Sequence, residues 1–125
     1  PLAAGFLSGK YRKGQAPPDG TRFSGAAWKA RYAGFDNERS WRILAAVDAV
    51  AKETSSTPAS VSLAWLLRKP AVTSVIIGAR TVEQLDDNLA CTKLALTDTH
   101  VKALDDASAF ELGYPYSFMQ NTWSP

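Results

Sequence analysis

The sequence of 125 residues predicts an α/β protein, and three observations support this class. Several segments repeat their apolar residues with the spacing of an amphipathic helix. The segment Ala71–Ile77 is a β-branched run without strict alternation, which is typical of a strand covered on both faces of a parallel sheet. Predicted helices precede and follow it, the order found in repeating α/β architectures. Because one strand cannot form a sheet, the chain is expected to be part of a larger fold.

Composition and charge are those of an ordinary globular domain. Apolar residues make up 46% of the chain, charged residues 21%, and the net charge is +2. This small charge gives no reason to expect nucleic acid or an anionic membrane as a partner. Cys91 is the sole cysteine, so an intrachain disulfide is excluded and a reducing, cytoplasmic location is expected. No apolar run approaches the roughly 20 residues of a membrane span, and no signal peptide is recognisable.

The first part of the chain is predicted to be mostly loop. Pro1–Gly25 holds five of the eight glycines and three of the seven prolines, which interrupt any regular spacing. The basic cluster within it, Lys10, Arg12 and Lys13, is typical of a solvated loop. Gly25–Asp36 mixes aromatic and polar residues and does not favour one secondary structure over another.

Two helices are predicted before the strand. The first runs from about Asn37 to Thr54, capped by Asp36 or Asn37, because Trp41, Leu44, Val47 and Ala51 recur close to one helical face. The second starts at Thr57-Pro58, a hydroxyl cap followed by proline at the first helical position, and stops before Pro70.

Two more helices are predicted after the strand. One begins at Thr81 and carries Leu85 and Leu89 on its apolar side. The last is capped by Thr97 and carries Val101, Leu104 and Ala107. The aromatic tail, residues 110–125, is expected to be irregular but packed.

The stretch VIIGARTVEQLDDN, residues 75–88, places polar residues directly after the predicted strand. Gly78 allows a close approach of backbone to a ligand, and Arg80 can form two parallel hydrogen bonds with a phosphate at the helix start. Thr81 and Gln84 have the spacing of a capping box. Gln84 and Asn88 share one helical face and could reach the edge of a planar base. From the residues alone, a nucleotide site and an ordinary capped surface helix both remain open.

Three long motifs resemble the C-terminal part of the aldo-keto reductases. They are PLAAGFLSGKY (residues 1–11), PASVSLAWLL (58–67) and VTSVIIGARTVEQLDDNL (72–89). The resemblance is closest to the bacterial and potassium-channel-β-like branch, and the tail LGYPYSF (112–118) is similar to the end of that branch. The motifs stand in the right order and cover nearly the whole chain.

The resemblance implies a (β/α)8 barrel that binds NADP(H) at the C-terminal face of its strands. The chain would supply about the last two β/α units with a C-terminal helix and tail, not a complete barrel. As one partial domain, residues 1–125 would divide into a cofactor-covering loop region (1–36), helices (37–70), a strand and cofactor-binding helix (71–91) and a C-terminal helix and tail (92–125).

The resemblance also implies which residues hold the cofactor. Pro1, Leu2, Ala3 and Gly5 match a loop whose backbone runs along the pyrophosphate. The other matched residues are Ser8 and Lys10 near the same phosphates, Arg22 in the covering loop, Gly78 and Arg80 at the adenosine phosphate, Gln84 and Asn88 at the adenine, and Asp87 at the adenine or its ribose. Arg80 would contact the 2′-phosphate that distinguishes NADP from NAD.

No catalytic residue is expected in this chain. The family's tetrad of aspartate, tyrosine, lysine and histidine comes from the first half of the barrel, upstream of the residues that Pro1 matches. Tyr11 and Tyr32 do not match the tetrad tyrosine, and His100 is expected to be a surface residue. Because the chain starts at Pro1 without a methionine, both a processed product and a start inside a longer chain remain open.

The first functional hypothesis is therefore a piece of an NADPH-dependent reductase of aldehydes or ketones. A carbonyl compound would be its substrate, and the missing N-terminal half or another copy of the chain would be its partner. The alternative is a truncated product that binds nucleotide, or serves as structure, without catalysis. A helix-turn-helix DNA-binding unit at residues 58–89 is disfavoured by the apolar segment between the helices and the balanced charge.

Overall fold

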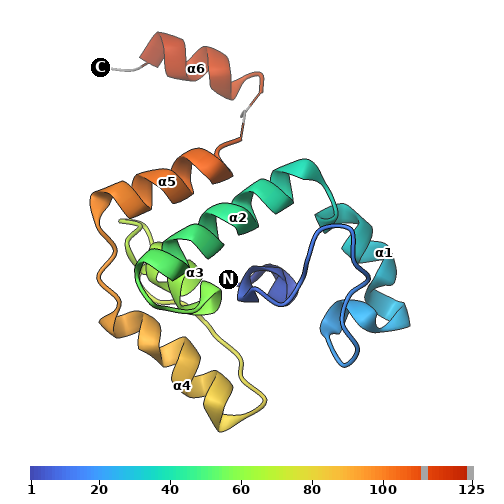
Figure 1. Ribbon diagram of the computed structural model, residues 1–125. Helices are drawn as coiled ribbons and strands as arrows, with labels where there is room; N and C mark the ends of the chain where they lie inside the picture. Colours follow the sequence, from blue (N-terminus) through green and yellow to red (C-terminus); the bar gives the residue numbers. More distant parts are fainter. Residues whose placement is uncertain (111–112, 124–125) are drawn as a thin grey trace.

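The computed structural model describes residues 1–110 and 113–123, and helices account for the regular structure within them (Figure 1). The α-helices are α1 (Ala26–Phe35), α2 (Glu38–Glu53), α3 (Pro58–Leu67), α4 (Val82–Ala90), α5 (Asp98–Ser108) and α6 (Tyr116–Trp123). Short 3-10 helices are η1 (Ala3–Ser8), η2 (Arg22–Ser24) and η3 (Cys91–Lys93).

The predicted caps set the starts of three helices. The Ser40 N–H donates to the Asn37 side chain at 2.9 Å and begins α2, which decides between the two candidate caps. Thr57 accepts from the Ser60 N–H at 3.1 Å and begins α3. At the start of α5, Thr97 accepts from the His100 N–H, and the His100 ring accepts from the Thr97 N–H in return.

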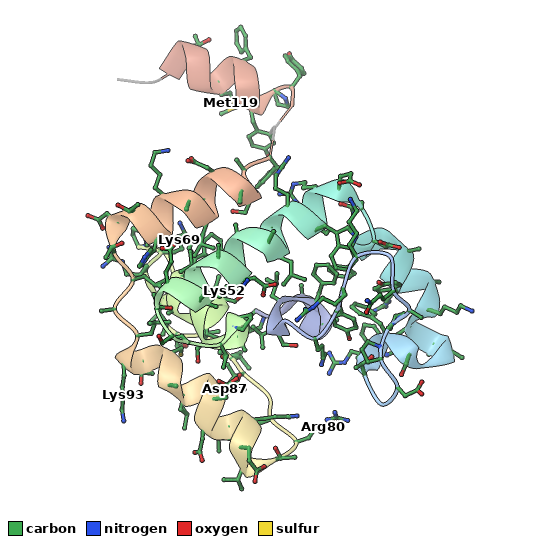
Figure 2. The ribbon with its side chains drawn as sticks, viewed as in Figure 1. Lys52, Lys69, Arg80, Asp87, Lys93 and Met119 are labelled. Carbon is green, nitrogen blue, oxygen red and sulfur yellow. The ribbon has the colours of Figure 1, made fainter. Side chains whose placement is uncertain are left out.

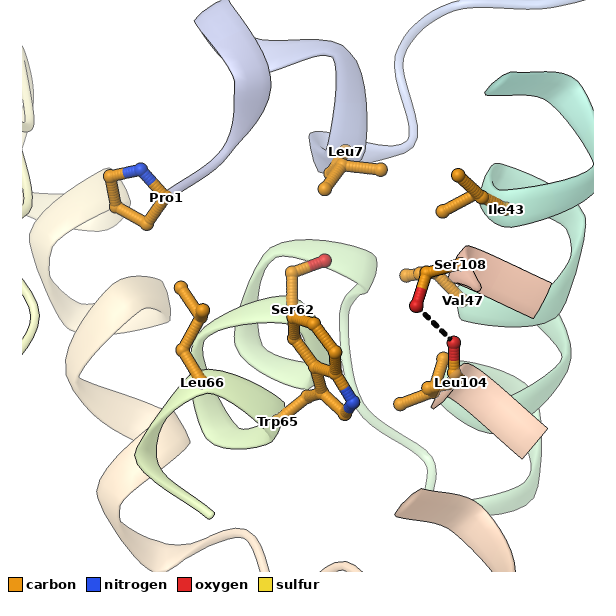
Figure 3. A pocket seen from close by; sticks show the side chains of 9 residues that line it. All are labelled: Pro1, Leu7, Ile43, Val47, Ser62, Trp65, Leu66, Leu104 and Ser108. Atoms are coloured by element: carbon orange, nitrogen blue, oxygen red, sulfur yellow. Dashed lines mark hydrogen bonds between the residues drawn. The ribbon is translucent and has the colours of Figure 1, made fainter. Parts of the chain in front are cut away.

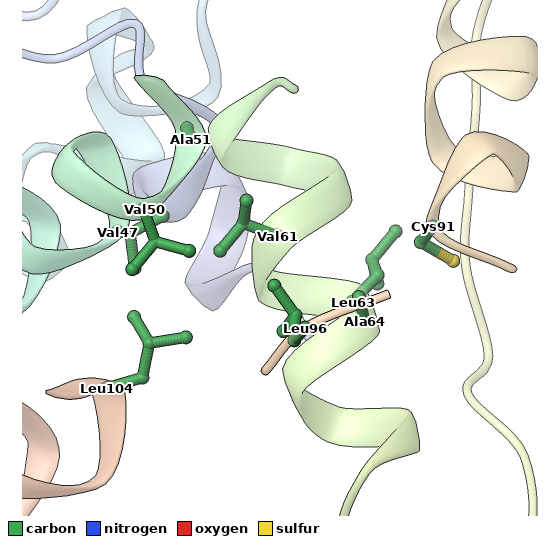
Figure 4. Close-up of a cluster of buried hydrophobic side chains, with 9 residues drawn as sticks. All are labelled: Val47, Val50, Ala51, Val61, Leu63, Ala64, Cys91, Leu96 and Leu104. Carbon is green, nitrogen blue, oxygen red and sulfur yellow. The ribbon is translucent and has the colours of Figure 1, made fainter. Parts of the chain in front are cut away.

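Helix α2 crosses the middle of the molecule, with α5 on one side and α3 on the other (Figure 1). Helix α4 lies beyond α3, and η1 packs against both α2 and α3. The buried core between α2, α3, α5 and the segment after α4 is shown in Figure 4. Its members are Val47, Val50, Ala51, Val61, Leu63, Ala64, Cys91, Leu96 and Leu104.

A second buried cluster is almost entirely aromatic and joins the N-terminal loop to α1 and α2. It contains Phe6, Tyr11, Phe23, Trp41 and Leu44. Phe6 stacks on Tyr11 with ring centroids 5.8 Å apart, and Phe23 lies 5.3 Å from Tyr11. This cluster fixes the long irregular N-terminal segment, which would otherwise have no regular structure to hold it in place.

The predicted strand at Ala71–Ile77 is wrong for this chain, because that segment has no regular structure. Val75 and Ile77 pack against the core, but Ile76 between them is 87% exposed. The side chains alternate as in a strand, while one face is left to solvent. A strand also needs backbone partners, and the part of the chain that the structure describes offers none to this segment.

The expectation of an irregular but packed tail is wrong for the described part of residues 110–125. Tyr116–Trp123 forms α6, which lies apart from the other helices in Figure 1. Phe110, Tyr114 and Phe118 are exposed. The remainder of the tail, residues 111–112 and 124–125, lies outside the described residues.

The ambiguous segment Gly25–Asp36 contains a helix, α1, without a fully buried residue. Its partly buried Trp28, Tyr32 and Phe35 pack against the aromatic cluster. Across residues 1–110 and 113–123, each helix is too short or too polar to cross a membrane.

Candidate functional site

Lys10 is under the electrostatic influence of two cations from distant parts of the sequence. Burial of its ammonium lowers the pKa of Lys10, and repulsion from Arg80 and then Arg22 lowers it further. Within the described residues, the ion pairs formed at up to 4 Å involve other cations and leave these three without a carboxylate. We call Lys10, Arg22 and Arg80 the cationic cluster.

The basic stretch after η1 separates into residues with different partners. Lys13 pairs with Glu38 at 2.7 Å, and Arg12 donates to the carbonyls of Gly9 and Tyr11. Lys10 instead lies close to Gly5, where a Cβ atom would be 3.0 Å from its Nζ. Lys10 is exposed, as expected for a solvated basic loop, but its pKa responds to cations outside that loop.

The backbone of η1 shapes the surface beneath Lys10. Ala3, Ala4 and Gly5 all have positive φ, at 48°, 58° and 89°. A Cβ atom at Gly5 would lie 3.0 Å from the Lys10 Nζ, so a larger residue there would push the ammonium away. Ser8 donates to the Gly5 carbonyl at 2.8 Å and closes the turn. Two alanines in the left-handed region store backbone strain, which tends to collect at binding sites.

Pro1 and Leu2 lie in apolar surroundings. Leu2 packs against the main core, and Pro1 helps to line a cavity of about 180 Å³ between η1, α2, α3 and α5 (Figure 3). The cavity walls are mostly apolar, including Leu7, Leu66 and Leu104. Its serine hydroxyls already donate to carbonyls of their own helices, Ser62 to Pro58 and Ser108 to Leu104. This cavity therefore offers little polar chemistry and lies on a different part of η1 from Lys10.

The loop from Gly78 to Arg80 is held on α4 by the side chains of that helix. Gln84 accepts from the Arg80 N–H at 3.0 Å, and Thr81 accepts from the Gln84 N–H at 3.3 Å. Thr81 therefore caps α4 as predicted. In a capping box the Gln84 side chain would accept from the Thr81 N–H, but here it accepts from the Arg80 N–H, one residue earlier. Asn88 is 5% exposed, with its amide nitrogen 3.5 Å from the Gly78 carbonyl. The polar residues Gln84 and Asn88 therefore fix the backbone of the loop that carries Arg80.

Asp87 joins α4 to α3, on the side of α4 that faces α3 (Figure 2). The Thr57 hydroxyl donates to its carboxylate at 2.8 Å, and the Ser60 hydroxyl donates to its backbone carbonyl at 2.6 Å. The resemblance implied a contact between Asp87 and the nucleotide, whereas Asp87 is bound within the protein. No local pattern marks this link, since the partners are 30 and 27 residues apart.

Arg22 has an aromatic neighbour that the sequence analysis also missed. Its guanidinium carbon lies 5.2 Å from the centre of the Trp28 ring, and that of Arg31 lies 4.8 Å from the same ring. The sequence shows two arginines and a tryptophan within residues 22–31. It does not show that η2 packs on α1, which is what brings Arg22 to the Trp28 ring.

The residue types of a carbonyl-reducing tetrad are dispersed here. Tyr11 and Tyr32 belong to the aromatic region around Phe6. His100 lies at the other end of α2, where its Nε2 is 3.3 Å from the Glu53 carboxylate. With its side chain 18% exposed and both ring nitrogens engaged, His100 links α5 to α2 and is more buried than the surface residue expected. In the described ranges, no cluster of three or more metal-ligating side chains is found.

Comparison with known proteins identifies the family. The sequence profile of the Aldo/keto reductase family matches residues 1–109. An uncharacterized oxidoreductase of Mycobacterium tuberculosis is 37% identical over 108 residues, which are 86% of this chain and 32% of that protein. An aldo-keto reductase of Schizosaccharomyces pombe, whose name specifies NADP(+), is 30% identical over 119 residues, 92% of this chain and 34% of that protein.

A norsolorinic acid reductase of Aspergillus flavus is 28% identical over 94 residues, which cover 75% of this chain and 24% of that protein. The chain thus spans between about a quarter and a third of the length of the curated relatives it matches. Because the family profile covers most of its residues, the chain belongs to the aldo/keto reductase family.

Proposed function

We propose that this chain is the NADP(H)-binding, C-terminal portion of a reductase that converts aldehydes or ketones to alcohols. Membership of the family supports a reductase, and the name of the S. pombe relative supports NADP as the cofactor. The share of the relatives that the chain covers supports a part of a (β/α)8 barrel, with the domain divisions given above. The potassium-channel-β-like branch is part of the same proposal.

The cationic cluster is the observation that carries this proposal. Three positive charges close enough to lower the pKa of Lys10, with no carboxylate among them in the described residues, form a site that favours a multiply charged anion. The turn at Gly5 keeps the Lys10 ammonium close to the backbone. The residues present therefore fit the phosphates of a dinucleotide.

In this proposal each residue binds or orients and none reacts. Lys10 and Arg22 hold the pyrophosphate beside η1, and Arg80, presented by the loop that Gln84 holds, binds the 2′-phosphate. Asn88 and Asp87 support this arrangement by fixing the loop and α4. The bound nicotinamide would supply hydride to a carbonyl carbon, and the proton donor would come from outside this chain. Its partner would be the remaining half of the barrel or another copy of the chain.

The test is the preference for NADP⁺ over NAD⁺. We expect Arg80→Ala to weaken NADP⁺ more than NAD⁺, because a charge-assisted phosphate contact contributes about 1.5–3 kcal/mol, or roughly 10- to 150-fold in affinity. Calorimetric titration of both cofactors measures the two losses. Lys29→Ala, which removes an exposed cation from α1, should change neither affinity. Equal weakening of both cofactors by Arg80→Ala would refute the 2′-phosphate role.

A further inference from the structure

Arg22 is a long, exposed side chain carried by a short element. It lies in η2, a single 3-10 turn whose preceding residue makes no side-chain cap. Within the described residues, its guanidinium forms no ion pair at up to 4 Å. A long, flexible side chain of this kind loses considerable conformational entropy when a ligand fixes it, unless another contact has already restricted it.

The Trp28 ring supplies such a contact. The Arg22 guanidinium carbon lies 5.2 Å from the ring centre, within the range of cation–π attraction, for which tryptophan is the best aromatic partner. The Trp28 indole itself packs against a buried aromatic ring. Trp28 and Phe23 have ring centroids 6.2 Å apart in an edge-on arrangement, and Phe23 is fully buried against Tyr11 and Phe35.

The ring is also held by its backbone. Trp28 stands in the first turn of α1, and its N–H donates to the Gly25 carbonyl at 2.9 Å. The contacts between η2 and α1 keep the two residues on the same side of the aromatic cluster. Trp28 thus joins the buried aromatic cluster to the Arg22 side chain, whose charge also acts on Lys10.

We propose that Trp28 is a positioning residue, whose ring holds the Arg22 guanidinium beside Lys10 and Arg80 so that the cluster is formed before a phosphate arrives. This inference rests on the proposed function for the identity of the phosphate ligand. The placement of Arg22 is independent of the proposed function, because it can be measured without a ligand.

The first experiment is a double-mutant cycle with NADP⁺ as the probe, measured by calorimetry. Trp28→Leu is expected to weaken NADP⁺ binding roughly two- to fivefold, the size of an exposed cation–π contact. In an Arg22→Ala background the same change should have no further effect, because no guanidinium remains to be positioned. Trp28→Phe, which keeps an aromatic ring, should restore part of the affinity.

Arg31→Ala is the matched control, because Arg31 contacts the same ring but is not among the charges that lower the pKa of Lys10. It should leave NADP⁺ affinity unchanged. Equal losses from Trp28→Leu with and without Arg22 would overturn the proposal, since Trp28 would then act on the fold or on the ligand directly.

The second experiment measures the titration of Lys10 by NMR in the absence of any ligand. Since Arg22 contributes to lowering the pKa of Lys10, Trp28→Leu should raise that pKa in the same direction as Arg22→Ala, and Arg31→Ala should not. An unchanged Lys10 titration in Trp28→Leu would overturn the positioning role. If the chain fails to bind NADP⁺ while Lys10 responds as expected, the proposed function fails and the positioning of Arg22 stands.

Discussion

At the scale of one residue, Lys10 carries a charge that its surroundings oppose. Its ammonium is partly buried against Gly5 and repelled by Arg80 and Arg22, so the folded chain disfavours its charged form. An anion that binds the cluster would remove this repulsion. The same arrangement that destabilises the free protein would therefore favour a phosphate ligand.

This arrangement predicts how stability depends on pH. Because the folded-state pKa of Lys10 is lowered, the unfolded chain binds more protons between that value and the ordinary lysine pKa. Across this interval the contribution of Lys10 makes the free energy of unfolding rise with pH, and below it the cost of the charged ammonium is fully present. Urea unfolding should show a smaller rise in Lys10→Met than in the unsubstituted chain.

Saturating phosphate provides the control for that measurement, because a bound anion favours the charged ammonium. The difference between Lys10→Met and the unsubstituted chain should shrink when phosphate is present. A difference between the two chains that stays constant over the alkaline range, with and without phosphate, would contradict the role of Lys10 in the cluster.

At the scale of elements, the contact between α3 and α4 depends on Thr57. Its hydroxyl accepts from the Ser60 N–H as the cap of α3 and donates to the Asp87 carboxylate of α4. Thr81 is also a cap, but its hydroxyl serves α4 alone. We expect Thr57→Ala to lower the free energy of unfolding by about 2 kcal/mol and Thr81→Ala by about 1 kcal/mol.

Urea denaturation measures both losses. Thr57→Ser retains a hydroxyl and should recover most of the stability that Thr57→Ala loses. If the two alanine variants lose the same stability, the hydrogen bond between Thr57 and Asp87 does not hold α3 against α4.

The helices could be predicted from the sequence because their signals are local. Asn37, Thr57, Thr81 and Thr97 each accept from an amide three residues ahead, so the cap and the helix it begins lie within one turn. The target of Gln84 could not be predicted, since its reach to Arg80 depends on how the preceding loop turns. The strand failed for a related reason. Its β-branched residues favour extended backbone, but the hydrogen bonds that make a strand come from elsewhere.

The segment Thr73–Ile77 gives a direct test of that explanation. Because these residues form no backbone ladder in the described structure, their amides should exchange with solvent much faster than those of Val61–Ala64 in the buried helix α3. Hydrogen exchange by NMR measures both sets in one sample. Slow exchange at Thr73–Ile77 would show that the segment pairs as a strand after all, with another copy of the chain as the partner.

At the scale of the whole molecule, the structure separates a packed centre from surfaces that remain apolar and exposed. The centre is formed by α2, α3 and α5. Ile76 and the α4 residues Val82, Leu85 and Leu89 are exposed.

The candidate site was partly predictable at this scale. The resemblance to a family assigned Lys10 and Arg80 to phosphates and Arg22 to the covering loop, and in the structure the charges of Arg80 and Arg22 both lower the pKa of Lys10. The residues that hold them could not be found in the same way. Trp28 and Thr57 act through contacts between separate elements, which one sequence does not reveal. The assignments of Asp87 and Asn88 to the nucleotide stay predictions, because both already have partners within the protein.

The central claim is that the chain binds the cofactor but does not catalyse its reaction. The most direct test is an NADPH oxidation assay with a broad set of aldehydes. We expect the 125-residue chain to bind NADPH and to show no aldehyde-dependent oxidation. Its sole histidine is engaged with Thr97 and Glu53, far along α2 from Tyr11 and Tyr32, so the proton donor that contributes about 10²–10⁴-fold is not assembled. Aldehyde-dependent oxidation that survives repurification and a check of the intact mass would contradict this account, as would the absence of NADPH binding.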